Sequence, residues 1–260
     1  RNELSSSPVS VAQPAAGNNM YSDFNSDGPR YEICKWVYKV VDHYSFDREI
    51  ATVAMSYFDR MIWKSTSRSD DTQPNYELLA VTCLYTAVKL NEHRNKRGML
   101  DALVHMSRRR FTVADITSME FTMFKTLSWF LNPVTPQSFA QRFLELFPRS
   151  CCYIDRAQVQ KIYDMSCYII ELSLFDSELM KKRPSAIAIA AVIISLQGAD
   201  SSKVSLESQT VFVNNLTSFD HSNDLHFAKS RMSQFLSDHH ASKLADIRST
   251  IDPNAIFYSK

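Results

Sequence analysis

The sequence predicts an all-α protein built from two successive helical bundles. Apolar residues return at steps of three and four along most of the chain, which is the period of an amphipathic helix. The 260 residues include only four glycines, so glycine-rich phosphate loops and the tight turns of β meanders are missing. Segments 78–90 and 186–196 are apolar nearly all the way round and rich in small residues. Helices of this kind lie at the centre of a bundle, with neighbours on every side.

The composition argues against several classes of function, namely nucleic-acid binding, membrane insertion, metal binding and catalysis. The 29 Lys and Arg residues nearly balance the 28 Asp and Glu residues, which argues against direct nucleic-acid binding through bulk charge. The longest apolar run, 186–196, is too short to span a bilayer, so no membrane partner is expected. The five cysteines include no CxxC pair, and the histidines show no metal-ligand spacing. No catalytic residues, cofactor or metal site are therefore predicted.

The first bundle is expected at 29–133, after a flexible tail at 1–28 that is rich in Ser, Pro, Ala and Asn. Pro29 suits the first turn of a helix. Asp47 and Thr112 are each expected to cap a helix that follows. Helices are expected in order at 29–41, 47–62, 78–90, 99–106 and 113–127.

The second bundle is expected at 134–240, followed by a tail at 241–260. Pro133 and Pro136 disfavour helix at the residues before them, so segment 132–136 is expected to link the bundles. Segment 201–223 is polar, with one apolar patch at Val211–Val213. Helices are expected at 137–146, 157–172, 186–196 and 225–236.

Several segments at once resemble the cyclin family. The stretches RYEICKWVYKVVDHYSFDREIATVAMSYFDR, YELLAVTCLYTAVKLNEH and ITSMEFTMFKTLSWFLNPVTPQSF resemble the cyclin box in order and spacing. YIIELSLFDSELMKKRPSAIAIAAVIISL is similar to the carboxy-terminal cyclin fold. The resemblance implies tandem five-helix cyclin folds, each with its third helix buried at the centre. It also implies a regulatory subunit that binds and activates a cyclin-dependent protein kinase in cell-cycle control, located in the nucleus and cytoplasm and not itself an enzyme.

By the same resemblance, Lys89 and Glu120 bind the regulatory helix of the kinase. Without the resemblance, Lys89 would be interpreted as a lysine at the carboxy-terminal end of a helix, where the helix dipole favours a positive charge. Glu120 would be interpreted as a solvated carboxylate on a helix face. Replacing either residue is expected to leave the stability of the free protein nearly unchanged. Trp129 also falls where the family presents apolar contacts to the kinase, beside Phe121, Phe124 and Leu131. Aromatic residues at helical spacing more often belong to a core, and Trp129 is the least expected of these four at the interface. The further kinase-contacting residues implied are Thr86, Leu90, Phe121, Phe124 and Leu131.

Two more features follow from the resemblance. Arg30 and Asp59 match a structural ion pair that ties the first helix to the second. Ile33 and Trp36 match the apolar floor of a substrate-docking patch, but this patch is degenerate. Lys39 stands where an acidic residue usually reads the arginine of an RxL peptide, so weak or absent docking is expected.

Two alternatives use the same fold: a transcription adaptor that bridges DNA and polymerase, and a transcriptional cyclin. The nearly neutral charge counts against the adaptor, because such a protein would approach phosphates directly. Lys89 and Glu120 in their sequence context favour a kinase partner. The identity of the kinase and the phase of the cell cycle stay open.

Overall fold

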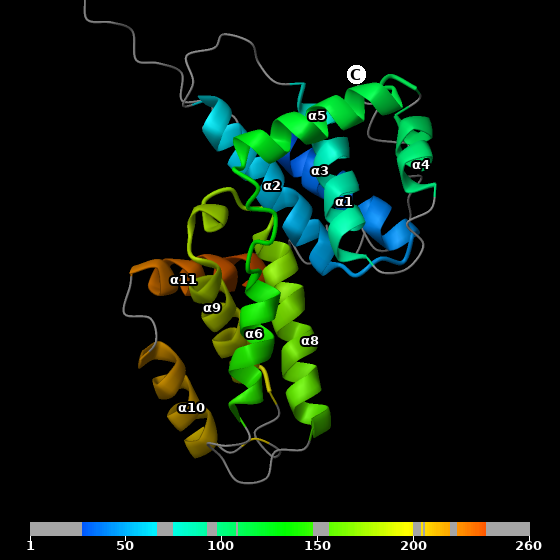
Figure 1. Ribbon diagram of the computed structural model, residues 1–260. Helices are drawn as coiled ribbons and strands as arrows, with labels where there is room; N and C mark the ends of the chain where they lie inside the picture. Colours follow the sequence, from blue (N-terminus) through cyan, green and yellow to red (C-terminus); the bar gives the residue numbers. More distant parts are fainter. Residues whose placement is uncertain are drawn as a thin grey trace, which may run out of the picture.

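The computed structural model describes residues 28–66, 75–92, 98–107, 109–147, 156–199, 204, 206–218 and 223–237, in which every regular element is helical. The helices form two bundles, one above the other in Figure 1. This is the predicted all-α tandem arrangement. The first bundle contains α1 (Pro29–His43), α2 (Glu49–Thr66), α3 (Tyr76–Asn91), α4 (Met99–Met106) and α5 (Val113–Thr126). The second contains α6 (Pro136–Glu145), α8 (Arg156–Ser173), the short 3₁₀ helix η1 (Leu179–Lys181), α9 (Pro184–Gln197), α10 (Leu206–Ser218) and α11 (Asn223–Ser237).

The two small-residue helices lie at the centres of their bundles, as predicted. Helix α3 packs against α1, α2, α4 and α5, and α9 packs against α6, α8, α10 and α11. Ala80 and Ala87 of α3 are buried, as is every residue of α9 from Ala186 to Ile193. Small side chains let the neighbouring helices approach closely from all sides.

Local signals explain where several helices begin. Thr112 caps α5 through a reciprocal pair of hydrogen bonds with Asp115, and these bonds hold the pKa of the Asp115 carboxyl below its usual value. Asn75 caps α3 by accepting a hydrogen bond from the amide of Leu78 at 3.1 Å. Helix α10 lies within 201–223, the polar stretch for which no helix is predicted. It buries only Phe212 and Leu216, a stripe too sparse for periodicity to reveal.

The chain returns to the first bundle after α8. Leu174 is buried within the core of the first bundle, and the ring of Phe175 lies 5.2 Å from that of Tyr31 and 5.8 Å from that of Tyr38. From the other side, the hydroxyl of Ser138 on α6 donates to Glu49 of α2 at 2.9 Å. The bundles are therefore joined by shared core residues as well as by the linker.

Arg30 and Asp59 form the predicted ion pair between α1 and α2. The Nε and Nη2 atoms of Arg30 each donate to one carboxylate oxygen of Asp59 at 2.8 Å, and Nη1 donates to the carbonyl of Leu174 at 2.8 Å. Burial opposes the charged form of Arg30, but attraction and hydrogen bonds from Asp59 outweigh it and raise the pKa of the guanidinium. The pair thus ties α1 to α2 and to the segment after α8.

Asp59→Asn keeps the size of the side chain but leaves the buried guanidinium without its counter-charge. We expect the free energy of unfolding to fall by about 2–3 kcal/mol, because a buried charge that loses its partner is strongly destabilising. Denaturant unfolding followed by circular dichroism measures this loss. Glu145→Gln is the matched control, since the Arg142–Glu145 pair is exposed and should contribute less than about 1 kcal/mol. Equal losses in the two variants would contradict the structural role of the buried pair.

Candidate functional site

Lys89 and Glu120 meet where the end of α3 crosses α5. The Nζ atom of Lys89 lies 3.0 and 3.1 Å from the two carboxylate oxygens of Glu120. The Glu120 residue is 6% exposed, whereas the Lys89 side chain is 45% exposed. The pair therefore has a buried acidic end and an open basic end.

Glu120 is not the solvated helix-face carboxylate that its charge alone would suggest. It also accepts a hydrogen bond from the hydroxyl of Thr86 at 3.2 Å, so two groups of α3 fix its position. A carboxylate has about four acceptor positions, so the three donated hydrogen bonds leave Glu120 capacity for one more. A partner amide that approaches the pair meets an acceptor whose geometry is already set.

The position of Thr86 differs from the one expected. It was expected to contact the kinase, but it is fully buried and has no surface to offer a partner. Its hydroxyl instead orients Glu120. The near-neutral effect on stability that was expected for replacing Glu120 also fails on physical grounds, because this residue is buried and hydrogen-bonded rather than exposed.

Large apolar side chains are exposed beside the pair. Leu90 follows Lys89 and Phe121 follows Glu120, and both are exposed. Phe124 and Leu131 are half-buried and pack on the first core. Trp129, the residue least expected at the surface interface, is 64% exposed, with its ring 5.2 Å from that of Phe124. Exposed apolar surface next to a partly buried ion pair is typical of a protein-binding site.

The turn after α5 has an unusual backbone. The amide of Trp129 donates to the carbonyl of Phe124 at 2.9 Å, and that of Ser128 to Lys125 at 3.1 Å, which is the Schellman pattern. Glycine usually occupies the left-handed position of this motif, but here Ser128 and Trp129 have φ values of 55° and 61°. Each costs roughly 1–2 kcal/mol relative to a right-handed conformation, so other contacts must hold the turn.

Three side chains of α2 supply those contacts. Tyr57 donates to the carbonyl of Leu131, Arg60 to that of Phe130 at 2.9 Å, and Lys64 to that of Thr126 at 2.6 Å. The three residues lie on one stripe of α2, at spacings of three and four. Sequence reasoning missed this role, since the spacing shows a common helix face but not which distant carbonyls that face meets.

The residues of the degenerate patch offer little surface. Ile33 and Trp36 are both buried in the core of the first bundle. A groove that binds peptides needs exposed apolar side chains at its floor, so their burial adds a second reason to expect weak docking.

In the described ranges, no group of three or more His, Cys, Asp and Glu side chains lies close enough to hold a metal ion. Among the same residues, no helix has the length and apolar character needed to cross a bilayer.

Known proteins similar to this chain include curated plant cyclins. It is 32% identical over 167 residues to Cyclin-D3-3 of Arabidopsis thaliana, covering 63% of this chain and 44% of that protein. It is 30% identical over 200 residues to Cyclin-D2-1 of Oryza sativa subsp. japonica, covering 72% of this chain and 58% of that protein. The chain thus spans about half the length of these curated relatives.

Solved structures share the fold at low sequence identity. A viral cyclin from herpesvirus saimiri aligns with a TM-score of 0.59 and 15% identity, over 78% of this chain and 84% of that one. A chain in the structure of a CAK complex from Chaetomium thermophilum, bound to ATP-γ-S, aligns with a TM-score of 0.58 and 14% identity, over 87% of this chain and 69% of that one.

Family models cover nearly the whole sequence in two adjoining pieces. The model described as "Cyclin, N-terminal domain" matches residues 12–132, and "Cyclin, C-terminal domain" matches residues 134–255. The two pieces meet at the linker between α5 and α6, and each contains one of the buried central helices, α3 and α9. On this evidence, the chain belongs to the cyclin family.

Proposed function

We propose that this chain is a regulatory subunit that binds and activates a cyclin-dependent protein kinase in cell-cycle control, with no catalysis of its own. The observation that carries the proposal is the Lys89–Glu120 pair, which is buried at one end, open at the other and flanked by exposed Leu90 and Phe121. The relatives named as D-type cyclins support the cell-cycle role over a transcription adaptor or a transcriptional cyclin.

The geometry suggests how binding becomes activation. A regulatory subunit shifts its partner between two conformations only through contacts that are better in one of them. Lys89 offers N–H donors to backbone carbonyls of the kinase, and Glu120 accepts from its amides. Because Thr86 and Lys89 already fix Glu120, little ordering remains to be done on binding. On this proposal, the kinase helix presents its backbone to both groups in its inward position, and this difference in contact favours the active conformation.

The exposed apolar residues add affinity to this polar contact. Leu90, Phe121 and Trp129 lose contact with water when the partner covers them. A side chain that goes from fully exposed to fully buried contributes about 1.5–3 kcal/mol, and these three, already partly covered, contribute only the share of their exposed part. The turn that carries Trp129 is held by Tyr57, Arg60 and Lys64, which we assign as positioning residues because they act through the turn rather than on the kinase.

Lys89→Met and Glu120→Gln should each weaken binding of the cognate kinase by about 30-fold or more, because removing one member of a desolvated charged contact costs at least about 2 kcal/mol. Isothermal titration calorimetry with the kinase and a kinase assay at saturating subunit measure binding and activation. The free energy of unfolding should fall by about 1–2 kcal/mol for Glu120→Gln, whose hydrogen bonds are buried.

Arg142→Met, an exposed cation of the second bundle, is the control for charge loss. Melting temperatures and affinities must come from the same preparations, so that unfolding is not mistaken for lost binding. A folded Lys89→Met/Glu120→Gln double variant that still activates the kinase fully would contradict the proposal.

Lys64→Met should loosen the turn after α5 without removing any proposed kinase contact. We expect faster amide exchange at 127–131, and a severalfold loss of kinase affinity with little change in the maximal activity at saturation. Hydrogen exchange followed by mass spectrometry gives the first readout, and titration of kinase activity the second. Unchanged exchange at 127–131 would show that Lys64 does not hold this turn. Lys64→Arg keeps a donor for the Thr126 carbonyl and should recover most of the affinity.

An RxL-type peptide should bind with a Kd weaker than about 1 mM, because Ile33 and Trp36 are buried and Lys39 repels the arginine of the peptide. Calorimetry with the peptide gives the affinity directly. Lys39→Glu restores the usual charge and tests whether the repulsion is the barrier, while an Arg-to-Ala peptide is the control. Micromolar affinity in the unmodified protein would overturn this expectation.

A further inference from the structure

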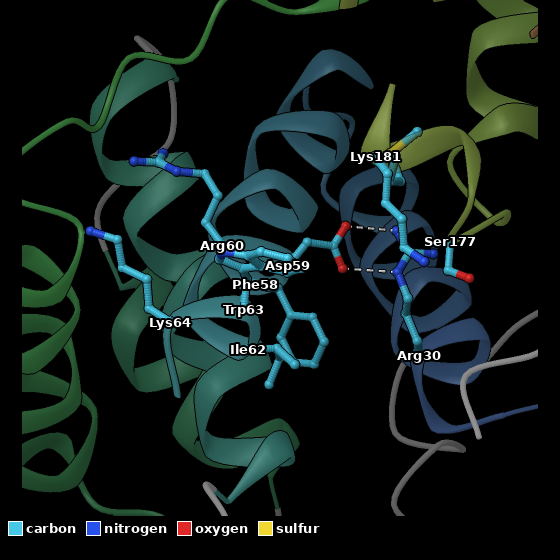
Figure 2. A pocket seen from close by; sticks show the side chains of 10 residues that line it. Arg30, Phe58, Asp59, Arg60, Ile62, Trp63, Lys64, Ser177 and Lys181 are labelled. Atoms are coloured by element: carbon cyan, nitrogen blue, oxygen red, sulfur yellow. Dashed lines mark hydrogen bonds and ion pairs between the residues drawn. The ribbon is translucent and has the colours of Figure 1, made fainter. Parts of the chain in front are cut away.

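A cavity of about 410 Å³ lies where the start of α1, the second half of α2 and residues 177–181 meet (Figure 2). Its volume is within the range of about 300–1,000 Å³ that is typical of ligand pockets. Both bundles contribute to it, since Phe58 and Trp63 come from α2 and Met180 from η1. The cavity is separate from the Lys89–Glu120 pair, neither member of which lines it.

The lining of the cavity is mostly apolar. Phe58 and Ile62 are buried in the first core and close one side, and Met180 packs between the two cores. Trp63 is 60% exposed, although it lines the same space. An exposed tryptophan beside a hollow of apolar side chains is the kind of residue that dominates protein–protein contacts.

The charges around this apolar lining are predominantly positive. Among the described residues that line the cavity, Asp59 is the one acidic residue, and Figure 2 shows its carboxylate facing Arg30 across both hydrogen bonds. In Figure 2, the side chains of Arg60 and Lys64 extend to the left of the view, whereas Lys181 lies on the right. Cations therefore flank the apolar lining on two sides, while the acidic group is already neutralised.

Two of these cations lack an acidic partner. Arg60 and Lys64 donate only to backbone carbonyls within the part of the chain that the structure describes. The Nη1 atom of Arg60 is buried and has no hydrogen-bond partner there. Desolvation accordingly lowers the pKa of Arg60. Lys181 pairs with Glu178 at 2.6 Å, but both side chains are exposed, so this pair is readily exchanged for another.

We propose that this cavity is a docking site for a short acidic segment of a partner protein, which inserts one aromatic side chain against Trp63 and Met180. The apolar lining selects the aromatic anchor, and the surplus positive charge selects carboxylates on either side of it. A basic segment would meet Arg60, Lys64 and Lys181 and be repelled.

The test uses the full chain and a fluorescein-labelled probe of sequence Asp-Glu-Asp-Phe-Asp-Glu-Asp, followed by fluorescence anisotropy. We expect saturable binding that weakens as salt is raised, because the contact relies on charges that are exposed, as in Lys181, or partly exposed, as in Arg60 and Lys64. Trp63→Ser should lower the affinity for the probe by about tenfold or more, and Lys181→Glu should lower it by a few-fold. A probe with Gly in place of Phe, and one with Lys in place of every acid, should not bind measurably.

Trp129→Ser is the matched control, since Trp129 is as exposed as Trp63 but does not line the cavity. It should leave the affinity for the probe unchanged. Lys181 is exposed, so Lys181→Glu keeps the test valid if Trp63→Ser fails to fold. Binding that survives both variants, or binding of the Gly probe equal to that of the Phe probe, would overturn the proposal.

The same experiment distinguishes two other occupants of the cavity, the amino-terminal stretch of this chain and a second copy of it. The amino-terminal stretch of this chain carries Asp23, Phe24 and Asp27, which have the proposed chemistry. If Phe24→Ser in the full chain raises the affinity for the probe, the occupant is this stretch, and the partner proposal is wrong. Light scattering that shows a dimer dissolved by Trp63→Ser would assign the cavity to a second copy and equally overturn it.

Discussion

The arrangement of the two bundles depends on the hydrogen bonds that the guanidinium of Arg30 donates. Its donors are divided between Asp59 on α2 and the carbonyl of Leu174, so one side chain fixes three segments that are distant in sequence. A planar cation with several fixed donors is suited to this, because a lysine would reach only one such group well. The pair also forms part of the cavity wall. Since Asp59 is neutralised there, the remaining charge of the cavity is positive.

Helix α2 connects the features described above. Asp59 faces α1, whereas Tyr57, Arg60 and Lys64 reach the turn after α5, and Trp63 lies exposed at the cavity. Arg60 and Lys64 belong to both surfaces, because they line the cavity and hold the turn that carries Trp129. The cavity and the proposed kinase-binding surface are therefore connected through two side chains of one rigid helix.

Periodicity and end signals in the sequence predicted the α-helices other than α10, the central position of α3 and α9, and the cap at Thr112, because these depend on residues close in the chain. The Arg30–Asp59 ion pair was predicted from the family resemblance. Two features did not follow from either: the burial of Glu120 and the role of the α2 stripe. Each depends on which distant backbone or side chain a residue meets, and local patterns carry no such information. Helix α10 was missed because its buried stripe holds only Phe212 and Leu216.

Leu174 and Phe175 make the first bundle depend on residues from the second half of the chain. Both residues follow α8, in the half that matches the carboxy-terminal family model, yet Leu174 completes the core of the other half and Phe175 lies against Tyr31 and Tyr38. A fragment ending at the linker would lack these groups and would carry a hole where they pack. The two halves match separate family models but share core residues, so a chain split at residue 133 should regain its native core only when both fragments reassociate.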